Sequence, residues 1–167
     1  MITNNTAIKQ ETFIKMVMDA WNSKVKRLDN LLSELDDQQL LKEVAPGRNQ
    51  GIYILGHLTE VNNAMLPLLD SREIMSPDVF KTFLQTANKD IVDLPSVNEV
   101  RQEWINVKTA LATQFLKMQP NDWFQKHTNV SEEDFAKEPH RNKLNVVITR
   151  TNHLDYHIGQ LVFLKKK

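Results

Sequence analysis

Four long segments of the chain place apolar residues every three or four positions, the spacing that gathers side chains on one face of an α-helix. The stripe of the first segment consists of Ile14, Met18, Trp21, Val25, Leu28, Leu32 and Leu35. The second segment, roughly residues 50–69, has Ile54, His57, Val61, Met65 and Leu68. The third has Val97, Val100, Trp104, Val107, Leu111, Phe115 and Met118, and the fourth, from about 142 to 164, has Val147, Thr151, Leu154, Ile158 and Leu161. A chain with four such stripes is expected to bury them against one another.

No strand pattern competes with these helices. The apolar runs 146–148 and 161–164 favour strands locally, but each lies within a longer helical period. Long connections at 71–95 and 120–141 allow a helix order other than simple up-down-up-down. We therefore predict an all-α helical bundle in which residues 1–167 form a single domain.

Local signals mark several helix ends and turns. Ser96 and Glu99 have the spacing of a capping box, which predicts that the third helix begins directly after Ser96. Asn49 is expected to cap the second helix, after a turn at Pro46-Gly47. A short helix is expected around 77–87, within the connection that follows the second helix.

The composition excludes several classes of protein. The 167 residues carry 21 basic and 21 acidic side chains, so the chain lacks the basic surface by which nucleic acid is usually bound. No window is apolar over the length that spans a bilayer, and the polar start lacks the apolar stretch of a signal peptide, so a cytoplasmic protein is expected. The chain has no cysteine, which excludes disulfides, thiolate ligands and a cysteine nucleophile. Any metal must therefore be held by histidine or carboxylate.

Three of the five histidines fall on inward or flanking stripes of two separate helices. His153 and His157 are four residues apart and lie one turn apart on one helix face, at the edge of the apolar stripe. His57 occupies an inward position of the second helix. Two imidazoles at that spacing can hold one metal ion, and a third from another helix would complete a site with open coordination positions. Each histidine taken singly is better explained by packing, but the three together predict a metal site.

The polar residues beside these histidines have more than one explanation. Gln160 lies one turn beyond His157, where its amide is expected either to orient a ligand or substrate or to be a surface side chain. Glu60 and Tyr53 flank His57 by one turn on either side. Both could orient His57 or reach a substrate, but exposure to solvent is the better expectation.

The remaining histidines and one glycine are less informative. His127 and His140 lie in the polar connection 120–141 and are expected at the surface, although either could serve as a fourth ligand. The aromatic residues of this connection predict that it packs against the helices, over the site. Gly159 costs its helix about 1 kcal/mol relative to alanine, which a close approach of another helix or of a substrate would explain.

The histidine pair does not match the motifs of common hydrolases. In zincins a glutamate base follows the first histidine, whereas Leu154 follows His153 here, and Asp155 is expected to point away from the histidine face. The chain offers no serine in a strand-turn-helix elbow, and its four glycines form no phosphate-binding loop.

The motifs Leu55-Gly56-His57-Leu58 and His153-x-x-x-His157-x-Gly159-Gln160 together resemble those of the DinB-like family, named for damage-inducible genes. The resemblance covers nearly the whole chain, and all three histidine positions match. The family overlaps with the bacillithiol transferases and with proteins described as metal-dependent hydrolases. The resemblance implies a four-helix bundle with a long crossover, a metal site of His57, His153 and His157, a zinc or nickel ion, and often a homodimer. It indicates the site better than the reaction, because many members have no established activity.

Three functions fit these features. The first is a thiol S-transferase, in which a low-molecular-weight thiol at a divalent zinc or nickel ion loses its proton and attacks an electrophile. The second is a metal-dependent hydrolase of an amide or ester, assisted by Gln160 or Glu60. The third is a non-catalytic, stress-related bundle with a structural metal, which is expected to have a fourth protein ligand. The first two imply a small-molecule substrate, and none implies a nucleic-acid or membrane partner.

Overall fold

The computed structural model describes residues 2–71, 78–85 and 94–166, with side chains from residue 7 onward. Within these ranges every regular element is a helix, apart from two isolated β-bridges, which confirms the prediction of an all-α protein. The long helices coincide with the four predicted stripes: α1 (Ile2–Glu34), α3 (Gly51–Asn63), α6 (Val97–Lys117) and α8 (Lys143–Leu161). The short elements are α2 (Asp37–Leu40), α4 (Met65–Leu68), η1 (Asp78–Lys81), α5 (Thr82–Gln85), η3 (Asp122–Phe124), α7 (Glu132–Lys137) and η4 (Val162–Leu164).

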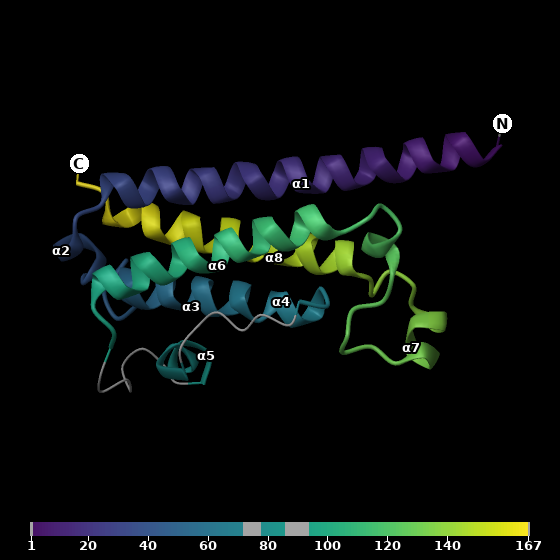
Figure 1. Cartoon of the computed structure of the whole chain (residues 1–167). Helices are drawn as coiled ribbons and strands as arrows, with labels where there is room; N and C mark the ends of the chain where they lie inside the picture. Colours follow the sequence, from purple (N-terminus) through teal and green to yellow (C-terminus); the bar gives the residue numbers. More distant parts are fainter. Residues whose placement is uncertain (1, 72–77, 86–93, 167) are drawn as a thin grey trace.

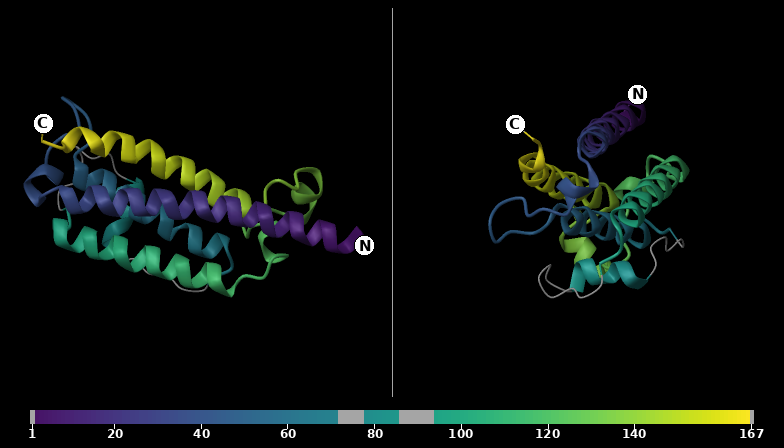
Figure 2. Two further views of the ribbon diagram at one scale, coloured as in Figure 1. Left: turned by 90° about the horizontal axis from the view of Figure 1, so that it is seen from above. Right: turned by 90° about the vertical axis from the view of Figure 1, so that its left-hand side faces the viewer.

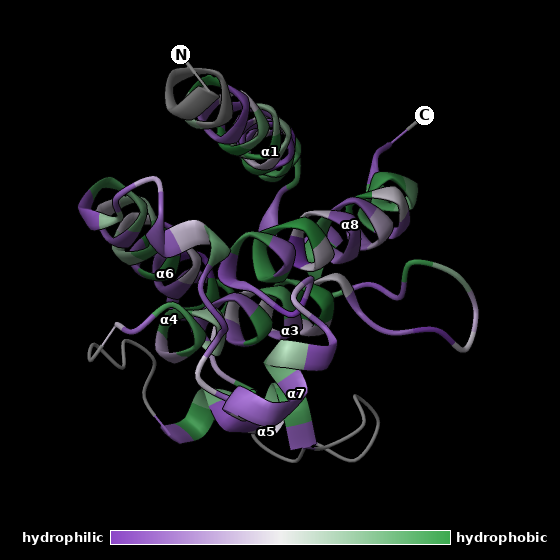
Figure 3. Ribbon diagram, turned by 90° about the vertical axis from the view of Figure 1, so that its right-hand side faces the viewer, coloured by the Kyte–Doolittle hydropathy of each residue, from purple (hydrophilic) through white to green (hydrophobic). Residues whose placement is uncertain are grey.

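The long helices run alongside one another (Figure 1). Helix α8 packs against both α1 and α3, and α6 packs along the other side of α3. Seen end-on, α1, α3, α6 and α8 surround a shared interior, and the N-terminal part of α1 extends beyond the other long helices (Figures 2 and 3). Among the described residues, no helix is both long enough and apolar enough to cross a bilayer.

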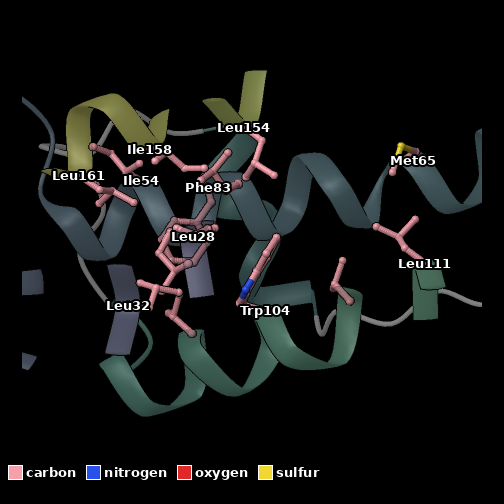
Figure 4. Close-up of a cluster of buried hydrophobic side chains, with 14 of the residues drawn as sticks. Leu28, Leu32, Ile54, Met65, Phe83, Trp104, Leu111, Leu154, Ile158 and Leu161 are labelled. Carbon is pink, nitrogen blue, oxygen red and sulfur yellow. The ribbon is translucent and has the colours of Figure 1, made fainter. Parts of the chain in front are cut away.

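The interior is filled by the predicted apolar stripes. Leu28 and Leu32 of α1 meet Trp104 of α6, while Leu154 and Ile158 of α8 lie on the opposite side of the cluster (Figure 4). Trp21 and Trp104 are both buried, as predicted. Removing a large apolar side chain of this kind from water contributes roughly 1.5–3 kcal/mol, so these stripes supply most of the stabilisation of the fold.

The helix ends follow local chemistry, with two differences from the predictions. The capping box of Ser96 and Glu99 is formed, and α6 begins at the next residue. Helix α3 is capped by Gln50 without a side-chain hydrogen bond, so the assignment of Asn49 as its cap is wrong. Its first amide, that of Gly51, donates instead to the carbonyl of Lys42 at 3.0 Å, because the preceding turn closes against the helix start.

Helix α3 also ends earlier than predicted. It stops at Asn63, and a separate turn of helix, α4, follows Ala64. Pro67 explains the break, because it has no amide hydrogen to donate to the carbonyl of Asn63 and its ring crowds that carbonyl. The short helix expected around 77–87 is present as η1 and α5, while the ends of that prediction lie outside the described residues.

Candidate metal centre

The three predicted histidines come together between α3 and α8. The Nε2 atom of His153 lies 3.3 Å from Nε2 of His57 and 3.2 Å from Nε2 of His157. Two nitrogens that each bind a tetrahedral ion at 2.0–2.1 Å are separated by about 3.3–3.4 Å, so the observed spacing is compatible with the binding of one ion. The ligand atoms of all three residues lie within 4.8 Å of one another. These histidines are therefore close enough to hold one ion.

Hydrogen bonds at the far side of two rings fix which nitrogen faces the centre. Nδ1 of His57 donates to the carbonyl oxygen of Phe83 at 3.0 Å, and Nδ1 of His157 donates to Oε1 of Gln160 at 2.7 Å. Because both acceptors are carbonyl oxygens, each neutral ring carries its hydrogen on Nδ1 and presents a lone pair on Nε2. One hydrogen on Nε2 of His153 could satisfy only one of these lone pairs, whereas a metal ion satisfies all three rings.

The contact between His57 and Phe83 depends on Gly56. A Cβ atom added to Gly56 would lie 2.5 Å from the ring of Phe83, which is fully buried. The absence of a side chain on α3 therefore lets α5 approach closely enough for its backbone to reach His57. The Gly-His pair of the sequence motif thus combines a candidate ligand with the space for the group that orients it.

The electrostatic environment favours the neutral forms of His153 and His157. Burial, together with the neighbouring imidazoles of His157 and His57, lowers the pKa of His153 from 6.5 to about 4. Burial also lowers the pKa of His157, which is only 9% exposed, although its hydrogen bond with Gln160 acts in the opposite direction. A metal binds the neutral imidazole, so this environment favours a ligand set that is ready at neutral pH.

Arg150 adds a positive charge next to the centre. It lies one helical turn before His153 on α8, is half-buried, and contributes to the lowered pKa of His153. Its Nε atom is buried without a hydrogen-bond partner, and burial lowers the pKa of its guanidinium. A partly buried arginine with no ion pair to the described residues favours negative charge at the neighbouring site.

Two tyrosines contact the histidines, and a buried glutamate lies one turn from His57 on α3. The ring of Tyr53 lies nearly parallel to that of His57, and the ring of Tyr156 contacts His157 edge-on with centroids 4.9 Å apart. Tyr53 is half-buried and Glu60 is only 3% exposed, so the expectation that both face solvent is wrong. The amphipathic pattern alone could not reveal this, because α3 is covered on several sides by α5, α6 and α8.

The other sequence candidates lie away from the centre. Neither His127 nor His140 joins the cluster in the described part of the chain. His140 is exposed as predicted, whereas His127 is half-buried and its Nδ1 lacks a partner. Asp155 forms ion pairs with Lys24 at 3.0 Å and Arg27 at 3.2 Å, so it ties α8 to α1 and points away from the histidines, as predicted.

The connection 120–141 packs at the start of α8 instead of over the histidines. Trp123 is buried against Phe115, and the hydroxyl of Thr128 donates to the carbonyl of Pro67. The segment that reaches the site is α5, from the other long connection. A Cβ atom on Gly159 would meet nothing within 4 Å, so no neighbouring helix explains this glycine.

Sequence reasoning missed three contributors to the site. Arg150 and Tyr156 could have been found, because each lies three residues from His153 on the same helix. The carbonyl of Phe83 could not, because a main-chain group carries no side-chain signature and comes from a connecting segment.

The chain matches no protein-family model, and no curated protein is significantly similar to it in sequence.

Proposed function

We propose that this protein is a DinB-like thiol S-transferase in which His57, His153 and His157 bind a zinc or nickel ion. The observation that carries the proposal is the convergence of three Nε2 atoms at metal-site spacing, with the Nδ1 atoms of two rings already engaged. The described residues bring no fourth histidine or carboxylate into the cluster. Three protein ligands leave a coordination position for a substrate, as in catalytic zinc sites.

The arrangement of the motifs supports the family assignment. The Leu-Gly-His-Leu motif lies on α3, and the His-x-x-x-His-x-Gly-Gln motif lies on α8, which packs against it. The long helices α1, α3, α6 and α8 support a four-helix bundle. Helices α3 and α6 run in the same direction, so the connection before α6 serves as the crossover, whereas the connection before α8 joins two helices at the same end of the bundle (Figure 1).

The proposed reaction joins a small-molecule thiol to an electrophilic carbon. The thiol S–H bond breaks, a C–S bond forms, the bond from that carbon to its leaving group breaks, and the proton passes to solvent. A divalent ion held by three neutral imidazoles keeps its full charge and lowers the pKa of a thiol bound to it. Gln160 and the Phe83 carbonyl hold two of the rings in orientation, and Arg150 favours negative charge on the reacting sulfur.

The alternatives receive less support from the site. A hydrolase needs a base for water, but the described residues place no carboxylate in the cluster, and Oε1 of Gln160 is engaged with His157. A structural metal normally has four protein ligands, whereas the described cluster has three.

A homodimer is part of the proposal. Ile8, Phe13 and Met16 expose apolar surface on the first turns of α1, and Leu116 of α6 is 87% exposed. An apolar groove of about 560 Å³ lies between these helices. Covering the groove and Leu116 with a second copy would remove this apolar surface from water, so light scattering is expected to give twice the mass of the chain. The mass of a single chain would contradict this part.

The test combines metal analysis with a thiol-transfer assay. Wild-type protein is expected to hold about one zinc or nickel ion per chain, and His57→Ala is expected to lose it. His140→Ala is the matched control, because it removes an exposed histidine outside the cluster. The metal-loaded wild type should conjugate low-molecular-weight thiols to an aryl halide or an alkylating bimane. Full metal occupancy without conjugation of any thiol would overturn the transferase assignment and favour a structural metal.

A further inference from the structure

A cavity of about 560 Å³ opens between α8 and the turn formed by residues 43–50. Its lining includes Arg48, Asn49, Ile54, Tyr156, Gln160 and Phe163. Its walls therefore come from the turn, from α3, from α8 and from η4. None of the functions considered above assigns a role to this turn.

The cavity lies beside the helical turns that carry the three histidines. Each of the three histidines has a residue one turn away along its own helix that lines the cavity. Ile54 precedes His57 by three residues, while Tyr156 and Gln160 follow His153 and His157 by three. One turn corresponds to about 5 Å along a helix, so the cavity begins about one helical turn from the histidines. Gln160 links the cavity to His157, since it lines the cavity and accepts the hydrogen bond from Nδ1 of that ring, on the side away from Nε2.

The charge on the cavity wall is positive. Arg48 is the single charged residue among its described lining residues, and the described part of the chain gives it no ion pair or side-chain hydrogen bond. Glu43, the acidic residue of the same turn, accepts instead from the backbone amide of Gly47 at 2.9 Å. An anionic group entering the cavity would therefore meet an exposed guanidinium that has no ion pair among the described residues and whose fork of donors suits a carboxylate.

The turn that carries Arg48 is well defined. Gly47 has a φ of 72°, which favours glycine, and the amide of Arg48 donates to the carbonyl of Ala45 at 2.9 Å. The amide of Val44 donates to the carbonyl of Asn49 at 3.1 Å and closes the turn at its base. The arginine is thus presented from a hydrogen-bonded scaffold, which lowers the entropic cost of binding.

The rim of the cavity is aromatic and open to solvent. Tyr156 is 64% exposed and Phe163 is 76% exposed, and both line the cavity. Exposed rings of this size gain free energy when they are covered by an apolar group. The lining therefore combines one anion-binding group with an apolar surface.

We propose that this cavity binds the thiol substrate, with its carboxylate on Arg48 and its apolar part against Tyr156 and Phe163. This inference rests on the proposed function, and it identifies the substrate as a low-molecular-weight thiol that carries a carboxylate. Arg48 recognises the charge, whereas Arg150 acts at the sulfur, so substitution of Arg48 changes the selectivity among thiols and leaves metal binding unchanged.

The first test measures the cavity without any reaction. 3-Phenylpropionate and its neutral amide have nearly the same shape and differ in charge. In an NMR titration of metal-free protein, the acid is expected to shift the backbone amide of Gly47 and the side-chain amide of Gln160, and to bind about tenfold more tightly than the amide. Arg48→Gln should abolish that preference and Arg48→Lys should restore part of it. Lys42→Gln is the matched control, because it removes a nearby positive charge that does not line the cavity.

The second test connects the cavity to the metal. In cobalt-loaded protein, 3-mercaptopropionate is expected to produce a sulfur-to-cobalt absorption band at about tenfold lower concentration than 3-mercaptopropanamide, and Arg48→Gln should equalise the two. Equal binding of acid and amide in both titrations, or shifts that avoid the cavity, would overturn the inference. Acid preference for the phenyl probe but not for the thiol would place the carboxylate on the electrophile and overturn the thiol assignment. Absence of the cobalt band with every thiol would instead count against the transferase itself, because the phenyl probe tests the cavity separately.

Discussion

Helices α6 and α8 both pack on α3, but they bury different chemistry. The buried positions of α6 are apolar except for Glu103, which hydrogen-bonds Asn106 of its own helix. Helix α8 buries an apolar seam of similar composition, but its buried residues also include Lys143, Thr151 and His157. Helix α6 therefore only stabilises the fold, whereas α8 both stabilises the fold and carries a stripe of polar side chains.

The difference shows how one small core can carry a site. The apolar seam of α8, which includes Leu154 and Ile158, holds that helix in place, as the seam of α6 does. The histidines occupy the edge of the seam, where two of the three rings have a protein contact behind them and all three face a shared centre. We therefore expect substitutions on α6 to change the free energy of unfolding. Substitutions of His153 or His157, which form the histidine stripe of α8, are expected to change metal binding.

The largest effect is expected on the α6 side. Leu111→Ala removes a fully buried side chain and leaves a cavity, so it should lower the free energy of unfolding by about 2–5 kcal/mol. Chemical denaturation of metal-free and metal-loaded protein measures this loss, which should be similar in both. Gln102→Ala, on the exposed face of the same helix, should change stability by less than about 0.5 kcal/mol. A loss in metal affinity without a loss in stability for Leu111→Ala would remove the distinction between the two helices.

The second effect is expected in the histidine stripe. His153→Ala should weaken zinc or nickel binding by more than about 100-fold, because this ring lies next to both other ligand nitrogens. Its metal-free stability should change by less than about 1 kcal/mol, since the three facing nitrogens gain little from one another without an ion. Competition with a chromophoric chelator gives the affinity, and Asn152→Ala, an exposed neighbour on α8, is the control. Unchanged affinity in His153→Ala would exclude the proposed centre.

The contrast also explains which features could be predicted from the sequence. The all-α fold and the start of α6 depend on local signals, namely apolar periodicity and the Ser96 capping box, and both predictions are confirmed. The approach of His153 and His157 follows from helix geometry alone, and His57 was found because it occupies an inward position. The burial of Glu60 and the hydrogen bond from His57 to Phe83 depend on how connecting segments fold over α3, which no local pattern encodes.

A smaller effect is expected for Gln160, which accepts the hydrogen bond from His157 on the same helix, α8. Gln160→Leu keeps the size of the side chain but removes the acceptor for Nδ1 of His157, so it should weaken metal binding by about 10–100-fold. Gln160→Glu should preserve binding, because a carboxylate accepts the same hydrogen bond. The same chelator competition measures both variants. Equal weakening by Leu and Glu would mean that packing, and not the hydrogen bond, is the contribution of this residue.

The smallest effect is a difference in pH dependence between the two helices. The pKa of His153 is lowered to about 4 in the folded chain, and it returns to about 6.5 on unfolding. Between these values the unfolded chain binds the proton and the folded chain does not, so acid favours unfolding. The contribution of the neutral His153 ring to the free energy of unfolding is therefore complete above pH 6.5 and is lost as the pH falls toward 4. The lowered pKa of His157 changes the free energy of unfolding in the same direction.

Thermal unfolding of metal-free protein between pH 7.5 and 4 measures this dependence. His153→Ala should flatten the decline in melting temperature on the acid side, whereas Leu111→Ala should lower every melting temperature and keep the slope, because it removes no titrating group. Parallel curves for wild type and His153→Ala would mean that this ring is as easily protonated in the folded chain as in the unfolded one. The histidine stripe would then be open to water, and the separation between a stabilising α6 and a metal-binding α8 would have to rest on the ligand geometry alone.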